Sequence, residues 1–141
     1  MKSKTFFLYA DGGARGNPGP AGIGAVILDS KKKKVKEVYK YIGEATNNNA
    51  EYNALICVLE EASAIGADDI IVNLDSELVV KQLNGEYKVK SVDIKPLFEK
   101  AVEALRKFKS FEIKHIDRSE NKEADKLVNK AINLAGLFKK I

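Results

Sequence analysis

Two aspartates each follow a short apolar run, at the points where buried strands would end. Asp11 follows residues 6–10 (FFLYA), Asp75 follows residues 70–74 (IIVNL), and a small residue comes after each aspartate. If these strands are parallel neighbours, their Cα atoms are roughly 5 Å apart and both carboxylates face one small volume. Because a carboxylate beside another carboxylate is destabilised unless something neutralises it, a bound cation is the simplest explanation.

Two further acidic residues lie near predicted helix starts. Glu51 follows the polar stretch 46–49 (TNNN), and Asp125 lies near the start of the last predicted helix. With the two aspartates they form a candidate four-carboxylate cluster, whose hard oxygen ligands suit Mg²⁺ or Mn²⁺. Two such ions about 3.5–4 Å apart can activate a water and stabilise the leaving oxygen in phosphodiester hydrolysis. The pattern therefore favours a metal-dependent nuclease.

Each acidic residue also has an ordinary structural explanation. Glu51 stands three residues after Asn48, which fits a capping box, and Asp125 suits a helix N-terminus electrostatically. An aspartate before glycine or serine is common in turns. Capping does not explain an acid at the end of both apolar strands, so the four residues together favour a site.

Composition excludes several classes of protein. One cysteine (Cys57) and one histidine (His115) in 141 residues cannot build a disulfide framework or a zinc site. The net charge of +4 is compatible with nucleic acid but decides little. The N-terminal apolar run is too short for a signal peptide or a membrane span, so we expect a cytoplasmic protein with no membrane partner.

Apolar periodicity predicts nine elements. Strands are expected at 5–10, 23–28, 35–42, 70–74 and 111–116, and helices at 50–65, 79–83, 96–105 and 121–135. This order predicts an α/β domain in which an antiparallel meander is joined, through helical crossovers, by strands parallel to the first. Ligands of such sheets gather at the carboxyl ends of the parallel strands.

Five segments resemble, in order, motifs of the ribonuclease HI (type 1 ribonuclease H) family. They are 9–22 (YADGGARGNPGPAG), 46–52 (TNNNAEY), 75–76 (DS), 82–85 (QLNG) and 115–125 (HIDRSENKEAD). The resemblance implies a ribonuclease H-like α/β fold with a five-stranded mixed sheet flanked by helices, in one domain over residues 1–141. It also implies an endoribonuclease that cleaves the RNA strand of RNA/DNA hybrids.

The resemblance also implies roles for individual residues. Two Mg²⁺ ions, with Mn²⁺ as an alternative, would be held by Asp11, Glu51, Asp75 and Asp125. His115 matches a mobile histidine that helps proton transfer or product release in the family. Substrate contacts are expected from Gly12, Gly13, Asn17, Thr46, Asn47, Asn48 and Arg118. Thr46 matches a position that binds a phosphate of the DNA strand.

Alternatives remain open for several of these residues. A lone histidine in an alternating strand is ordinarily a partly buried packing residue. Arg118 could form a surface salt bridge with Glu120 or Glu123 instead of contacting phosphate. The asparagines suit turn and N-cap chemistry as well as contact with ribose hydroxyls.

The chain also departs from the family pattern. Gly13 and Glu77 stand where many bacterial relatives have serine and glutamine. Residues 86–95 run directly into the next predicted helix, and the chain has no tryptophan, so the basic substrate handle of some relatives is predicted to be missing. Three lysines in this segment could partly replace it by phosphate attraction, or could form a solvated face: Lys88, Lys90 and Lys95.

Three hypotheses are compatible with these residues. The favoured one is a monomeric endonuclease that leaves 5′-phosphate and 3′-hydroxyl ends and removes RNA primers and R-loops. A noncatalytic nucleic-acid-binding module would be expected to lack at least one carboxylate, and a proofreading-type exonuclease would carry Asp-x-Glu on the first strand. When the four proposed metal ligands are left out, the chain has sixteen acidic and twenty-four basic residues. The resulting net charge of +8 fits a nucleic-acid partner.

Overall fold

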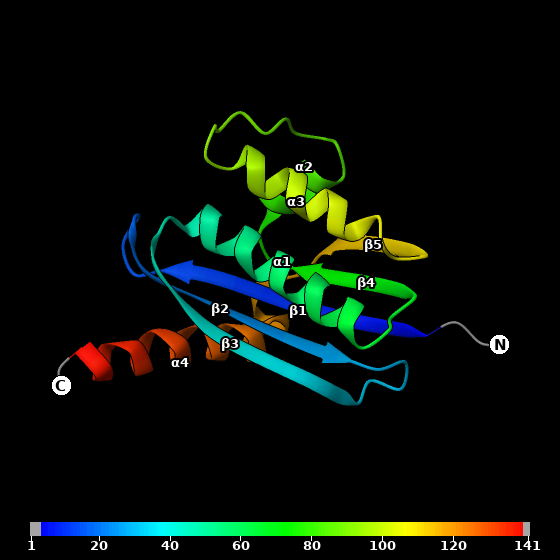
Figure 1. Cartoon of the computed structure of the whole chain (residues 1–141), viewed down its shortest axis with the longest axis horizontal. Helices are drawn as coiled ribbons and strands as arrows, with labels where there is room; N and C mark the ends of the chain where they lie inside the picture. Colours follow the sequence, from blue (N-terminus) through cyan, green and yellow to red (C-terminus); the bar gives the residue numbers. More distant parts are fainter. Residues whose placement is uncertain (1–3, 140–141) are drawn as a thin grey trace.

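The computed structural model describes residues 4–139 and contains one five-stranded sheet (Figure 1). The strands lie in the order β3-β2-β1-β4-β5. β2 pairs antiparallel with β1 and β3, whereas β4 pairs parallel with β1 and β5. Their bounds are β1 Thr5–Ala14, β2 Gly19–Leu28, β3 Lys34–Ala45, β4 Asp69–Leu74 and β5 Ser110–His115. The predicted mixed sheet is therefore confirmed.

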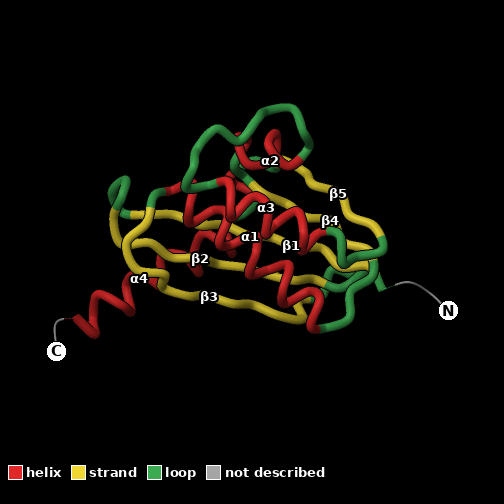
Figure 2. Tube along the Cα trace, turned by 45° about the horizontal axis from the view of Figure 1, so that its top comes forward, coloured by secondary structure: helices red, strands yellow, loops and turns green. Residues whose placement is uncertain are grey.

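Helices cover both faces of the sheet. They are α1 Asn47–Ala64, α2 Glu77–Leu83, α3 Lys95–Leu105 and α4 Lys122–Lys139, with a short 3₁₀ helix, η1 Arg118–Glu120, before α4. α1 packs over β1 beside α3, while α4 contacts β2 and β3 and projects past the end of the sheet (Figures 1 and 2). None of the helices within residues 4–139 combines the length and apolar character that crossing a membrane requires.

The core lies between the sheet and α1. Leu8 and Val72 come from adjacent parallel strands, and Leu55 and Leu59 come from the helix above them; all four have no exposed surface. Alternation along β1 sends Leu8, Ala10 and Gly12 toward α1 and the intervening residues toward the opposite face. The apolar periodicities of the sequence predict this packing.

The structure corrects the predicted end of the first strand. β1 does not stop at Ala10; it runs through Asp11 to Ala14, with Asp11 paired to Gly24 and Ala14 paired to Ala21. A Cβ at Gly12 would lie 2.1 Å from the Ala50 carbonyl oxygen, so glycine is required for α1 to approach this strand. The glycines that suggested a loop serve close packing instead.

The start of α1 excludes the capping box that the sequence suggested for Glu51. The helix begins at Asn47, and Thr46 is its N-cap, with its side-chain oxygen accepting a hydrogen bond from Asn49 N at 3.2 Å. Glu51 is therefore past the first turn, and the capping box from Asn48 to Glu51 is wrong. The carboxylate of Glu51 is free of that role.

Candidate active site

The parallel pairing of β1 and β4 brings two of the predicted carboxylates together. Ala10 of β1 pairs with Leu74 of β4, so the residues that follow them, Asp11 and Asp75, lie side by side. Asp11 lies within β1, where pairing with β2 continues, and Asp75 follows the last residue of β4. The site is thus built where one strand continues and its neighbour ends.

Two helices supply the other carboxylates. Glu51 comes from α1, which approaches the sheet over Gly12, and Asp125 comes from the first turn of α4. The Asp125 backbone N–H donates to the Asn121 carbonyl oxygen at 3.1 Å. Asp11, Glu51, Asp75 and Asp125 all line one cavity of about 330 Å³, together with Gly13 and the two arginines Arg15 and Arg118.

Burial and mutual repulsion make the ionised carboxylates costly. Burial raises the pKa of Asp11 to about 8, and the nearby negative charges of Asp75, Asp125 and Glu51 add to the increase. Burial also raises the pKa of Glu51, although a hydrogen bond with the Ser76 side chain opposes the change. One Glu51 oxygen, Oε2, is buried and has no hydrogen-bond partner among residues 4–139. A positive charge in this cavity would relieve all of these costs.

The donor set fits hard divalent cations. It consists of carboxylate oxygens, and the one cysteine, Cys57, is not among the lining residues. As the side chains stand, no three Asp, Glu, His or Cys side chains within residues 4–139 converge on a single coordination point. Glu51 Oε2, which has no hydrogen-bond partner among the described residues, is available as a ligand.

Asn121 is a structural part of the site that the sequence reasoning did not assign. Its side chain is 1% exposed, and its Nδ2 donates to both the Ala10 carbonyl oxygen and Asp75 Oδ2, each at 2.9 Å. Asn121 thereby ties β1, the end of β4 and the start of α4 together at the carboxylates. Its place in the segment 115–125 was the only signal in the sequence.

Arg118 and His115 lie on the rim of the site. The Arg118 side chain is 81% exposed, with its Nη2 3.7 Å from Asp125 Oδ1. The predicted alternative, a surface salt bridge with Glu120 or Glu123, is therefore wrong, because Arg118 pairs with Asp125, a carboxylate of the cavity. His115, the last residue of β5, is exposed, and its Nε2 lies 3.3 Å from the Asp75 carbonyl oxygen. It is not a buried packing residue.

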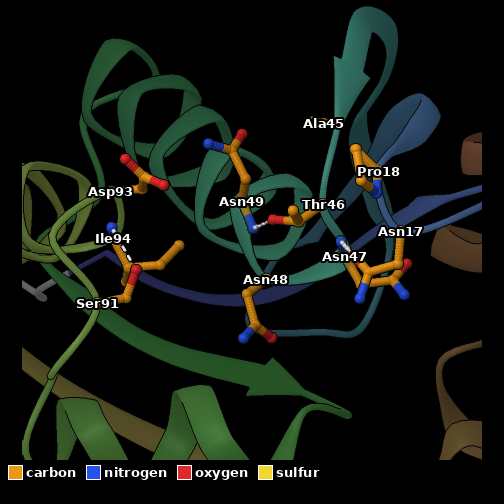
Figure 3. A pocket seen from close by; sticks show the side chains of 10 residues that line it. All are labelled: Asn17, Pro18, Ala45, Thr46, Asn47, Asn48, Asn49, Ser91, Asp93 and Ile94. Carbon is orange, nitrogen blue, oxygen red and sulfur yellow. Dashed lines mark hydrogen bonds between the residues drawn. The ribbon is translucent and has the colours of Figure 1, made fainter.

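A second, larger cavity of about 720 Å³ opens beside the N-terminus of α1 (Figure 3). It is lined by Asn17, Pro18, Ala45, Thr46, Asn47, Asn48, Asn49, Ser91, Asp93 and Ile94. Asn17 Oδ1 accepts from Asn47 N at 3.0 Å, and Asn47 Oδ1 accepts from Ala14 N at 2.9 Å. The turn chemistry expected for these two asparagines is present. Asn48 lines the cavity and makes no side-chain hydrogen bond within residues 4–139.

The segment between α2 and α3 contains no helix. The chain passes from Leu83 to Lys95 as a loop above α1, as Figures 1 and 2 show. Lys88, Lys90 and Lys95 are exposed and have no ion pair with the residues that the structure describes. Glu77, at the start of α2, is paired with Lys81 at 2.8 Å.

Comparison with known proteins defines the class. Residues 9–131 match the family model described as reverse transcriptase-like. Ribonuclease HI of Halobacterium salinarum is 44% identical over 125 residues, which cover 89% of this chain and 63% of the relative. The structure described as LC11-RNase H1 in complex with RNA/DNA hybrid has 46% identity and a TM-score of 0.88, and the match covers 92% of this chain and 98% of that one.

These matches define a ribonuclease H fold, with the carboxylates at the carboxyl end of the parallel strands. The chain belongs to the ribonuclease H family. It is also 43% identical to the bifunctional protein Rv2228c of Mycobacterium tuberculosis, over 91% of its own length but only 35% of that relative. The chain thus spans about a third of the mycobacterial relative and less than two thirds of the Halobacterium enzyme.

Proposed function

We propose that this chain is a metal-dependent endoribonuclease that cleaves the RNA strand of RNA/DNA hybrids. The observation that carries the proposal is the set of four carboxylates around one cavity, in a chain of the ribonuclease H family. The similar LC11-RNase H1, whose structure is described as a complex with RNA/DNA hybrid, supports the choice of substrate. The products are a 5′-phosphate and a 3′-hydroxyl end.

Asp11, Glu51, Asp75 and Asp125 would hold two Mg²⁺ ions, or Mn²⁺. When bound, such ions supply a water activated for attack and stabilise the charge that develops on the leaving 3′ oxygen. Asn121 fixes the orientation of the Asp75 carboxylate through Oδ2. Arg118 draws the scissile phosphate to the rim, and His115 Nε2, beside the Asp75 backbone, exchanges protons with the departing product.

The second cavity, at the start of α1, is an amide-lined cavity with one carboxylate, Asp93, and is suited to recognition of the substrate. Amides and hydroxyls both donate and accept hydrogen bonds, which is what reading 2′-hydroxyls and minor-groove edges requires. The Asn48 amide makes no hydrogen bond with the described residues and would contact the substrate there, and Thr46 would bind a phosphate of the DNA strand at the helix N-terminus. Asn17, Asn47 and the backbone of Gly12 and Gly13 would make further contacts with the substrate.

The remaining parts of the proposal concern the cellular context. We expect residues 1–141 to act as one ribonuclease H domain and as a monomer in the cytoplasm, where a free Cys57 is tolerated. We expect the cellular task of this enzyme to be the removal of RNA primers and R-loops. The lack of a helical handle between α2 and α3 predicts binding that depends strongly on salt.

The decisive experiment uses purified protein with Mg²⁺ or Mn²⁺ and a hybrid labelled on its RNA strand. We expect cleavage of that strand, loss of cleavage with EDTA, and loss of cleavage in Asp75→Asn with the circular dichroism spectrum retained. Double-stranded RNA, double-stranded DNA and a duplex with one ribonucleotide are run in parallel to establish selectivity. Hybrid binding without cleavage under every metal condition would instead support the noncatalytic module.

A further inference from the structure

The acidic cavity, the one lined by the four carboxylates, is also lined by an arginine that forms an ion pair with none of them. The chain has twenty-one lysines but only three arginines, and two of these, Arg15 and Arg118, line this cavity, where no lysine does. Arg118 is paired with Asp125. Arg15 has no ion pair with any residue in the described range 4–139, although the cavity carries four carboxylates.

Arg15 is held in place by a neutral partner. Its Nη2 donates to Asn129 Oδ1 at 3.3 Å, and Asn129 Nδ2 in turn donates to the Asp125 carbonyl oxygen at 3.2 Å. A guanidinium has five N–H donors in a fixed fork, so this single bond orients the group and leaves most donors free. The orientation of Arg15 is thus coupled to α4, the helix that carries Asp125.

The backbone around Arg15 is closely packed. Arg15 N donates to the Pro20 carbonyl oxygen at 2.9 Å, which closes the turn after β1. A Cβ at Gly19 would lie 2.2 Å from the Arg15 carbonyl oxygen, so the two sides of this turn are in direct contact. The side chain is exposed, whereas its base is fixed. Such a pre-organised cation loses little freedom when it binds a ligand.

From this geometry we infer that Arg15 is a substrate-binding residue that clamps a phosphate of the RNA strand next to the scissile one. Asn129 is four residues beyond Asp125, which is about one helical turn, or 5.4 Å, farther along α4. Arg15 is therefore displaced from the carboxylates, where cleavage takes place, and its free fork matches a phosphate in two-point contact. The inference rests on the proposed function.

The first test measures binding of a hybrid in Mg²⁺ by variants made in the inactive Asp75→Asn background. Arg15→Ala is expected to weaken binding about 10-fold and to lower the salt slope by about one phosphate contact, without dependence on sequence. Arg15→Lys keeps the charge and is expected to keep the slope while losing part of the affinity, because lysine lacks the fork. Arg106→Ala, an exposed arginine at the end of α3, is the matched control and should match the parent.

The second test locates the contact. Single neutral methylphosphonate linkages, each on a deoxyribose with a phosphodiester control, are placed in turn along the RNA strand. At one position beside the scissile phosphate, the neutral linkage should weaken the parent about 10-fold and leave Arg15→Ala unaffected, because both changes remove the same contact.

The outcomes separate the inference from the proposed function. If wild-type protein neither binds nor cleaves a hybrid, the proposed function fails. If it does both, but Arg15→Ala behaves like Arg106→Ala in affinity and salt slope, only the inference on Arg15 is overturned. A lower melting temperature of Arg15→Ala with unchanged hybrid affinity would likewise overturn it, since this pattern indicates a purely structural role.

Discussion

The two cavities at the N-terminus of α1 share Asn47 but differ in how their polar groups are satisfied. In the acidic cavity, which is lined by the four carboxylates, the pKa of Asp11 is raised, and Glu51 Oε2 is buried without a hydrogen-bond partner in the part of the chain that the structure describes. In the amide-lined cavity, the side chains of Asn17, Asn47 and Thr46 accept hydrogen bonds from backbone N–H groups of α1 and of the end of β1. The acidic cavity therefore destabilises the fold until a cation binds, whereas the amide-lined cavity is pre-formed.

This difference teaches how chemistry and recognition can be kept apart in two neighbouring cavities that share one lining residue. Repelling carboxylates cost stability, and that cost is recovered only when positive charge arrives. Hydrogen-bonded amides add stability at once and still offer free donors and acceptors to a substrate. Substitutions in the acidic cavity should thus affect catalysis and electrostatic stability. Substitutions in the amide-lined cavity should affect folding stability or affinity for the substrate.

The largest effect is expected for Glu51→Gln. The change keeps the shape of the side chain but removes a metal-ligand charge, so the rate of hybrid cleavage in Mg²⁺ should fall about 1000-fold. Glu60→Gln, on the exposed side of the same helix, is the matched control. Initial rates measured at saturating hybrid provide the comparison. Equal rates for the two variants would show that the acidic cavity is not the catalytic site.

The next largest effect is expected for Asn121→Ala. The change removes two hydrogen bonds from a fully buried amide, one of them to a carboxylate, and should lower the free energy of unfolding by about 3 kcal/mol. Chemical denaturation measures the loss, with Asn133→Ala on the exposed face of α4 as control. If both variants are equally stable, Asn121 does not tie the three segments together.

The acidic cavity should also make the metal-free protein less stable at higher pH. The folded-state pKa of Asp11 is raised to about 8, so between its ordinary value and pH 8 the folded state holds a proton that the unfolded state has released. This contribution is complete below the ordinary pKa of 3.8 and is lost progressively as the pH rises from there to about 8. In EDTA, Asp11→Asn should abolish this fall and stabilise the protein by about 2 kcal/mol at pH 8.

The measurement is urea unfolding in EDTA from pH 5 to pH 8, repeated with Mg²⁺. Added Mg²⁺ should reduce the fall in wild type and have less effect in Asp11→Asn, because the ion replaces the proton as the compensating charge. A wild-type stability that rises with pH over this range would contradict the electrostatic description of the cavity.

The smallest effects are expected in the amide-lined cavity, where substitutions of Thr46 and Asn48 should differ in their effect on stability. Thr46→Ala removes the N-cap of α1 and should lower the free energy of unfolding by about 1 kcal/mol. Asn48→Ala removes a side chain with no described hydrogen bond, so stability should stay within about 0.5 kcal/mol while KM for the hybrid rises several-fold. Unchanged stability in Thr46→Ala would contradict its role as the N-cap, and an unchanged KM in Asn48→Ala would contradict its proposed contact with the substrate.

The order of elements could be predicted because helix and strand periodicities are local. Residues 70–74 were expected as a buried strand, and β4 occupies Asp69–Leu74. The extension of β1 to Ala14 could not be predicted, because glycines and a proline indicate a loop when only neighbours along the chain are considered. Its pairing with β2 and its contact with Ala50 depend on segments distant in the sequence.

The contributions of Asn121 and Arg15 could not be found from the sequence for a similar reason. Asn121 binds a carbonyl oxygen 111 positions away and a carboxylate 46 positions away, and Arg15 binds an amide 114 positions away. Local spacing contains no information on such contacts. Arg118 shows the same limit, since the expected partners were its neighbours in sequence and the observed partner is a carboxylate of the cavity.

The sequence by itself determined which acidic residues are present, their order, and the elements that carry them, because residue type and periodicity are properties of the chain. Only the tertiary structure decided that Asp11, Glu51, Asp75 and Asp125 face one cavity and that Asp11 resists ionisation. Burial and the Coulomb interaction depend on distances in space, and these exist only once β1, β4, α1 and α4 have packed together.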